Sequence, residues 1–296
     1  MKRSYEMDLC SGPLLSKILL FSLPLILSGV LQLLFNATDI VVVGKFAGSN
    51  AMAAVGSTTS LFNLLVNSFI GISVGANVLV ARHYGERDYD GVQQTIQTAL
   101  LTGLIGGAIL IVLGVVLARP MLTLMATPDE VIDQAVLYMQ VYFIGMPATM
   151  IYNFGAAVLR AVGDTRRPLY FLMAAGVMNV LGDLLFVCIL GMGVAGTAIA
   201  TVLSQLASCL FVLRFLFGPI PPLRITFGGY SLRTMLRILL TGLTPFVIIA
   251  VDNMMIIALN AVLQRYGGPE QGDLLVAAAT VAQSFMLVVT MPLDGI

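Results

Sequence analysis

The chain has 296 residues, of which 58% are hydrophobic and 10% are charged, and its formal net charge is zero. Soluble domains carry about 25% charged residues, so this composition excludes an ordinary soluble domain and predicts a polytopic membrane protein. The balanced charge also excludes the basic surface of a nucleic-acid-binding protein, and we expect no nucleic-acid partner.

Eight apolar stretches are long enough to cross a bilayer, which takes about 20 helical residues. Polar connections separate most of them, and the fifth and sixth meet at the short turn LGMGVAG. The sequence therefore predicts an all-α fold, a polytopic membrane helix bundle. The predicted spans are 15–43, 53–81, 93–117, 131–158, 168–190, 194–216, 234–263 and 274–296.

Lysine and arginine are distributed unequally between the two ends of these spans. Twelve fall on the side that holds the amino terminus, and three, Lys45, Arg119 and Arg265, fall on the other. Basic residues accumulate in cytoplasmic loops. We therefore expect a monomeric, multi-pass protein of the plasma (cytoplasmic) membrane, embedded in the lipid bilayer, whose amino terminus faces the cytoplasm.

The seventh span resembles the first. Pro24 and Pro245 lie about a third of the way along them, and a shift of 224 residues places Asn36 on Asn260 and Ser60 on Ser284. An even number of spans per unit makes two copies parallel, which is one known plan of transporters. We expect both prolines to bend their helices, as hinges, because each removes a backbone donor and crowds the preceding turn.

This repeat predicts the domain organisation. A cytoplasmic amino terminus (1–13) precedes a six-helix amino-terminal lobe (14–217), and a cytoplasmic inter-lobe linker (218–231) leads to the first two helices of a second, parallel-repeat lobe (232–296). The sequence stops within an apolar helix, so we expect a longer protein of about twelve helices.

Polar residues inside the first, fifth and sixth spans share one depth. They lie one or two helical turns apart on a common face of each helix. At about 1.5 Å of rise per residue, Asp39, Asp183 and Thr201 lie roughly 7–12 Å below the outer surface. The aligned residues are Gln32, Asn36 and Asp39 in the first span, Asn179 and Asp183 in the fifth, and Thr197, Thr201, Ser204 or Gln205, and Ser208 in the sixth.

Carboxylate, amide and hydroxyl oxygens at one depth suit a small hard cation, and a carboxylate in a low-dielectric region can also bind and release a proton. A charged residue inside a span costs roughly 2.5–3.5 kcal/mol on insertion scales, which favours a functional role for Asp39 and Asp183. Asn63, Asn67 and Thr197 either line a cavity or join helices by hydrogen bonds. Asp252 has the same two interpretations.

Six stretches together resemble the multidrug and toxic compound extrusion (MATE) family of cation-coupled exporters. The likeness covers nearly the whole chain. The stretches are LPLILSGVLQLLFNATDIVVVG, AVGSTTSLFNLLVNSFIGISVGANVLVAR, RAVGDTRRP, MNVLGDLLF, GVAGTAIATVLSQ and TMPLDGI.

This resemblance implies twelve helices in two six-helix lobes around a substrate cavity. It implies a secondary antiporter, not an enzyme, that exports amphipathic or cationic organic compounds such as drugs and toxins while Na⁺ or H⁺ enters. The implied cation site consists of a first-span aspartate, a fifth-span Asn-x-x-x-Asp pair and a sixth-span threonine. These motif positions fall on Asp39, Asn179, Asp183 and Thr201, with Na⁺ a possible ligand and no cofactor beyond the coupling ion. We expect the polar residues of the cavity to be Gln32, Asn36, Asn63, Asn67, Thr197, Gln205 and Asp252.

Two other functions remain open. A flippase or exporter of lipid-linked oligosaccharides, from the same superfamily, would favour a deep cavity ringed by arginine, whereas this sequence keeps its bases at the cytoplasmic rim. An intramembrane aspartyl protease also needs two buried carboxylates. Its signature is Gly-x-Gly-Asp, but Val-Leu-Gly precedes Asp183.

Overall fold

The computed structural model describes residues 14–125, 127–218 and 228–294. Every regular element in these ranges is a helix, which confirms the all-α prediction. The elements are α1 (Leu14–Phe46), α2 (Ser49–Phe62), the π-helical η1 (Asn63–Asn67), α3 (Ser68–Gly85), α4 (Tyr89–Leu124), α5 (Asp129–Ile144), α6 (Met146–Ala161), α7 (Arg166–Asp183), the π-helical η2 (Leu184–Ile189), α8 (Gly193–Leu216) and α9 (Leu232–Asp294).

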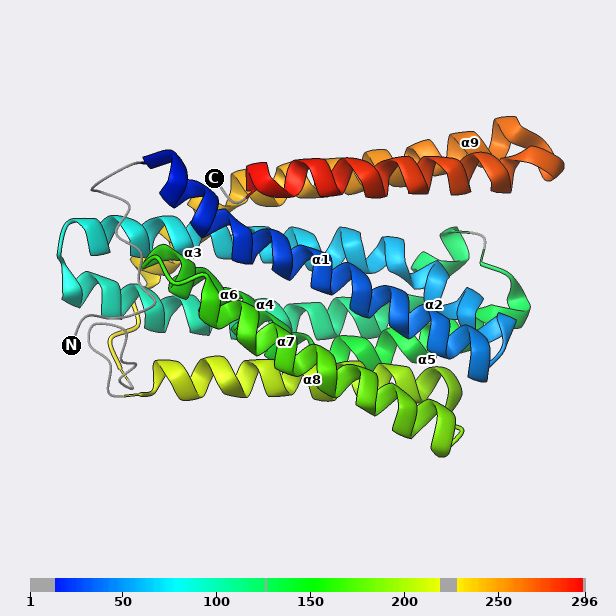
Figure 1. The fold of residues 1–296 in the computed structure, drawn as a ribbon, viewed down its shortest axis with the longest axis horizontal. Helices are drawn as coiled ribbons and strands as arrows, with labels where there is room; N and C mark the ends of the chain where they lie inside the picture. Colours follow the sequence, from blue (N-terminus) through cyan, green and yellow to red (C-terminus); the bar gives the residue numbers. More distant parts are fainter. Residues whose placement is uncertain (1–13, 126, 219–227, 295–296) are drawn as a thin grey trace.

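The helices run back and forth along one axis (Figure 1). We call the end where α1 begins the amino-terminal end; it also holds the α3–α4 and α6–α7 connections. Within the described ranges, six helices are long and apolar enough to span a membrane, and a bent pair brings the number to seven. Large apolar side chains stay exposed along them, for example Val112 and Val116, at 62% and 64%. The chain is therefore a multi-pass membrane protein.

The predicted fourth span, 131–158, is the bent pair. It consists of α5 and α6, whose axes meet at 49°. Gly145 ends α5, and Pro147 occupies the first turn of α6, where its missing N–H removes a hydrogen bond that would continue one straight helix.

The spans predicted at 234–263 and 274–296 fall within the single helical element α9 up to Asp294. In Figure 1 the ribbon of α9 runs out along one side of the bundle and turns back, so the carboxy-terminal end lies near the start of the element. The predicted amino-terminal segment 1–13 and most of the predicted linker 218–231 lie outside the described residues.

Helix α9 packs on α3 through a glycine crossing. A Cβ atom on Gly75 would lie 2.1 Å from the Ile238 carbonyl oxygen, and one on Gly242 would lie 2.6 Å from the Ile72 carbonyl oxygen. Only residues without a side chain allow two backbones to approach this closely. This crossing joins the predicted first lobe to the first helix of the second.

The connection between α6 and α7 is anchored by a buried carboxylate. Asp164 is fully buried, accepts a hydrogen bond from the Arg167 backbone N–H at 3.1 Å, and pairs with its guanidinium at 2.5 Å. That guanidinium also stacks over the Phe215 ring, 4.4 Å from its centroid. Gly163 supplies the left-handed turn, with φ 88°. The ends of α6, α7 and α8 are thereby tied together.

Candidate cation and substrate site

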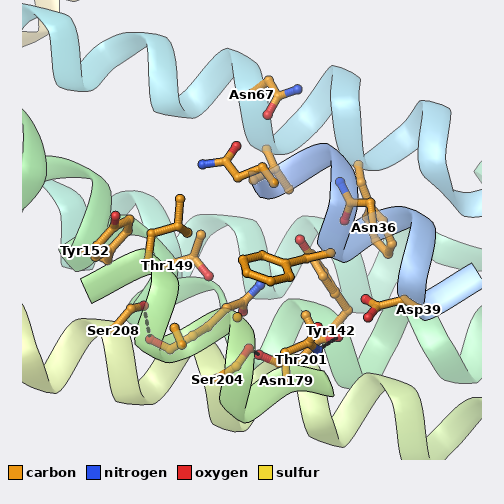
Figure 2. Close-up of a pocket in the computed structure, with 18 of the residues that line it drawn as sticks. Asn36, Asp39, Asn67, Tyr142, Thr149, Tyr152, Asn179, Thr201, Ser204 and Ser208 are labelled. Carbon is orange, nitrogen blue, oxygen red and sulfur yellow. Dashed lines mark hydrogen bonds between the residues drawn. The ribbon is translucent and has the colours of Figure 1, made fainter. Parts of the chain in front are cut away.

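A cavity of about 520 Å³ lies among the helices of the predicted first lobe. Its wall is mostly polar and aromatic and is contributed by α1, α2, η1, α3, α5, α6, α7 and α8. Figure 2 shows Asp39 and Asn36 toward one end of the cavity and Tyr152, Thr149 and Ser208 toward the other. A cavity of this size accommodates a small organic molecule.

Two aspartates meet beside this cavity. Asp39 on α1 lies on its wall and is 7% exposed, and Asp183 at the end of α7 is fully buried behind it. Their carboxyl groups are neighbours that interact electrostatically, without a hydrogen bond of normal geometry between them. The structure therefore brings together the two acids that the sequence places at one depth.

The predicted amide and hydroxyl companions lie next to these acids. Asn179, one turn before Asp183, donates its side-chain N–H to the Thr201 hydroxyl on α8 at 3.4 Å. Thr201 in turn donates to the Thr197 carbonyl oxygen at 2.9 Å. The π-helical turn η2 begins directly after Asp183, and such turns are frequent at functional sites.

Several buried oxygens in this region have no hydrogen-bond partner within the described residues. They are Asp39 Oδ1, both carboxylate oxygens of Asp183, the Thr197 hydroxyl and Gln205 Oε1. Buried polar atoms in native proteins are nearly always hydrogen-bonded, and buried carboxylates without partners are costly. A bound proton or a small cation would satisfy the two acids.

The other predicted cavity residues divide into two groups. Gln32, Asn36, Asn63, Asn67 and Gln205 all line the cavity, and the Asn67 amide donates to Asn63 Oδ1 at 3.3 Å.

The remaining two predicted cavity residues lie away from its wall. Thr197 is buried without lining the cavity, and Asp252 is exposed on α9 and is not among the lining residues. Among the described residues, no group of three or more His, Cys, Asp or Glu side chains could hold a metal ion. An Na⁺ ion would therefore rely on the carboxylate, amide and hydroxyl oxygens described above.

Aromatic residues form a part of the wall that the sequence interpretation missed. The rings of Phe62 and Tyr142 stack with centroids 4.1 Å apart, and Tyr138 tilts against Phe62 at 5.6 Å. All three line the cavity. Tyr138 and Tyr142 are spaced i, i+4 in the fourth span, and this spacing was the available signal that they share a helix face.

Arg160 corrects the expectation that every base lies at the rim. It belongs to the last turn of α6, and its side chain lines the cavity together with Tyr152 and Asn153. The bend between α5 and α6 sets the direction of α6 and so turns this face toward the cavity.

The prolines lie inside continuous helical segments, Pro24 in α1 and Pro245 in α9. The Ser28 hydroxyl donates to the Pro24 carbonyl oxygen at 2.8 Å. Their action as hinges stays a prediction.

Comparisons with known proteins agree with this architecture. A family model described as MatE matches residues 24–185. The probable multidrug resistance protein YoeA of Bacillus subtilis (strain 168) is 32% identical over 279 residues, which are 92% of this chain and 60% of YoeA. This chain therefore spans about three-fifths of that relative's length.

Solved structures show the same fold. The outward-facing conformation of a multidrug resistance MATE family transporter superposes with a TM-score of 0.84 at 26% identity, covering 94% of this chain and 61% of the other. The inward-facing conformation of a multidrug resistance MATE family transporter superposes with a TM-score of 0.75 at 25% identity, covering 88% of this chain and 59% of the other. The family match and these structures confirm the resemblance seen in the motifs, and the chain belongs to the MatE family of multidrug and toxic compound extrusion proteins.

Proposed function

We propose that this chain forms the ion-coupling part of a secondary antiporter that exports amphipathic or cationic organic compounds in exchange for Na⁺ or H⁺. Relatives with multidrug resistance names and structures support an exporter. The observation that carries the ion-coupled function is the pair of adjacent buried aspartates, Asp39 and Asp183, whose oxygens lack partners beside a ligand-sized cavity.

The acid pair would act as the coupling site. Two neighbouring carboxylates in a low-dielectric region repel each other when both are charged, so one proton or one Na⁺ between them lowers the energy of the site. Asn179 and Thr201 supply neutral oxygens close by. Binding of the ion from the outside and its release to the inside would drive movement of the substrate in the opposite direction.

The cavity composition favours cationic and aromatic substrates. The Phe62–Tyr142 stack offers flat surfaces, and the faces of aromatic rings attract cations. Asp39 adds a carboxylate to the same wall. An ion bound between Asp39 and Asp183 would therefore compete with a cationic substrate for the same negative charge, which links export to ion entry.

The unequal distribution of bases supports the orientation. We propose that the amino-terminal end of the bundle faces the cytoplasm of a plasma-membrane protein and that the monomer is the transporting unit. Transport needs no cofactor beyond the coupling ion.

The test is substrate efflux from proteoliposomes that contain the full-length protein, driven by an imposed Na⁺ or H⁺ gradient. Asp39→Asn and Asp183→Asn keep the shape of each side chain and remove its charge. Each should abolish gradient-driven efflux, and the double variant should be no worse than either single variant, because either change already disables the site. Arg119–Asp133 is an exposed ion pair away from the cavity, so Asp133→Asn is the matched control. Gradient-driven efflux at the wild-type rate by Asp39→Asn would refute the proposal.

A further inference from the structure

Arg160 lines the cavity without a carboxylate partner in the described part of the chain, whereas three other arginines make side-chain ion pairs. Arg82, Arg119 and Arg167 pair with Glu86, Asp133 and Asp164. Arg160 forms no such pair with any carboxylate in the described residues, although it lines the cavity. It therefore places an uncompensated positive charge on the cavity wall.

The Arg160 side chain points into the cavity. Helix α6 runs toward the amino-terminal end of the bundle, and side chains lean toward the start of their own helix. Arg160 thus leans back toward Tyr152 and Asn153, two turns earlier, and interacts electrostatically with Tyr152. An arginine that only reached for water would extend the other way, past the end of α6.

The polar groups of this part of the cavity wall have used most of their hydrogens within the protein, although the Asn153 amide has a second N–H. Tyr152 donates to the Pro168 carbonyl oxygen at 3.1 Å, and the Asn153 amide donates to the Thr149 carbonyl oxygen at 2.8 Å. Ser208 donates to the Gln205 carbonyl oxygen at 2.8 Å. At this end of the cavity, Arg160 is consequently the main source of donors for a ligand, and a guanidinium has five N–H groups.

The two ends of the cavity therefore carry opposite charge. Asp39 and Asn36 lie on the wall toward one end, and Tyr152 lies toward the other (Figure 2). Arg160 lines the cavity and interacts electrostatically with Tyr152, which places the positive charge at that second end. A partly buried guanidinium without an acid is costly, and an anionic group on a ligand would compensate it by charge-assisted hydrogen bonds.

We propose that Arg160 forms an anion subsite and that the cavity accepts zwitterionic amphiphiles. Their carboxylate binds the Arg160 guanidinium, while their ammonium group points toward Asp39. This inference rests on the proposed export function and narrows its substrate class, since a purely cationic substrate leaves Arg160 unpaired.

The experiment compares two fluorescent probes that differ in one charge. Nε-dansyl-lysine carries an ammonium and a carboxylate, and its methyl ester carries only the ammonium. Binding to the purified full-length protein is measured by the rise in dansyl fluorescence. The wild-type protein should bind Nε-dansyl-lysine at least tenfold more tightly than the ester. Arg160→Gln should remove this preference by weakening the zwitterion tenfold or more, with less than a threefold change for the ester.

Two further variants separate binding from folding. Arg160→Lys keeps the charge and should retain part of the preference. Arg166→Gln removes an exposed arginine, absent from the cavity wall, at the start of α7 and should change neither affinity. Equal weakening of both probes by Arg160→Gln would mean that Arg160 only supports α6, and it would overturn the proposal, as would a wild-type protein that does not distinguish the probes.

A third probe separates a carboxylate from a lipid headgroup. Short-chain dansylated phosphoethanolamine presents a phosphate diester, and tenfold tighter binding of this probe than of Nε-dansyl-lysine would overturn the assignment to soluble zwitterions. Failure of the proposed function gives a different result. If the proposed export function is wrong, Asp39→Asn would not change efflux of the methyl ester, whether or not Arg160 makes the protein prefer Nε-dansyl-lysine.

Discussion

Asn179 on α7 and Thr201 on α8 are joined by a hydrogen bond of 3.4 Å that links two helices beside the buried Asp183. The Thr201 hydroxyl accepts from Asn179 while it donates to its own helix. One oxygen thus holds the amide that lies one turn before Asp183, and both Asn179 and Thr201 line the cavity.

Thr201→Val should impair ion coupling far more than stability. Valine keeps the shape of threonine but removes the acceptor for Asn179 and one neutral oxygen of the proposed ion site. We expect gradient-driven efflux to fall about tenfold and the free energy of unfolding to fall by about 1 kcal/mol, the net contribution of one hydrogen bond. Efflux and thermal unfolding are measured on the same preparation. Thr123→Val is the matched control, because Thr123 makes the same bond to its own helix at an exposed position. Equal efflux from both variants would contradict the role of Thr201.

The glycine crossing between α3 and α9 predicts a large effect from one added methyl group. Gly75→Ala would place a Cβ atom 2.1 Å from the Ile238 carbonyl oxygen, so the helices must separate. We expect a loss of about 1–3 kcal/mol in the free energy of unfolding, typical of overpacking. Thermal unfolding in detergent measures it. In Gly56→Ala the new methyl group meets open space, and this control should be neutral or slightly stabilising. Similar melting temperatures for the two variants would show that α3 and α9 are not tightly packed.

The buried Asp164 should stabilise the α6–α7 connection. Asp164→Asn removes the carboxylate charge that pairs with the Arg167 guanidinium over the Phe215 ring. We expect the free energy of unfolding to fall by about 1–3 kcal/mol, because the Asp164 carboxylate is fully buried. Partial exposure of Arg167 keeps the loss within this range. Glu86→Gln removes an acid from the exposed Arg82–Glu86 pair and should change stability by less than about 1 kcal/mol. Urea unfolding of both variants provides the comparison, and an equal effect would contradict the anchoring role.

The orientation is tested by labelling single cysteines in intact cells. Arg166 is exposed at the start of α7, at the amino-terminal end of the bundle, and Leu124 is 87% exposed at the opposite end. In a background without other reactive cysteines, a membrane-impermeant maleimide should label Leu124→Cys from outside and should label Arg166→Cys only after the membrane is opened. The reverse pattern would overturn the orientation and with it the direction of ion entry.

The acid pair was predictable from sequence, whereas the polarity of the cavity was not. Asp39 and Asp183 stand out because each is a charge within a long apolar run, and helical rise alone gives their depth. Arg160 has no such signal, since an arginine in the last turn of a span can reach toward either end. Its direction depends on the bend at Gly145 and Pro147, and a bend angle cannot be read from composition.

Asp252 shows the opposite case. Its position in an apolar run resembles that of Asp39, yet it is exposed on α9 and does not line the cavity. Hydropathy identifies a costly residue, but it does not say which neighbours the residue meets. That information comes from the packing of whole helices, which involves contacts far apart in the sequence.

The crossing of Gly75 and Gly242 has a consequence for movement. Most helix contacts hold long side chains in single rotamers, and each such side chain loses up to about 2 kcal/mol of conformational freedom when the contact forms. Here backbone touches backbone, so closing this contact restricts no side chain at its centre, and opening it releases none. Side-chain entropy therefore neither favours nor opposes this helix crossing. A relative movement of α3 and α9 at this point would change packing and backbone contacts without freeing or ordering a long side chain.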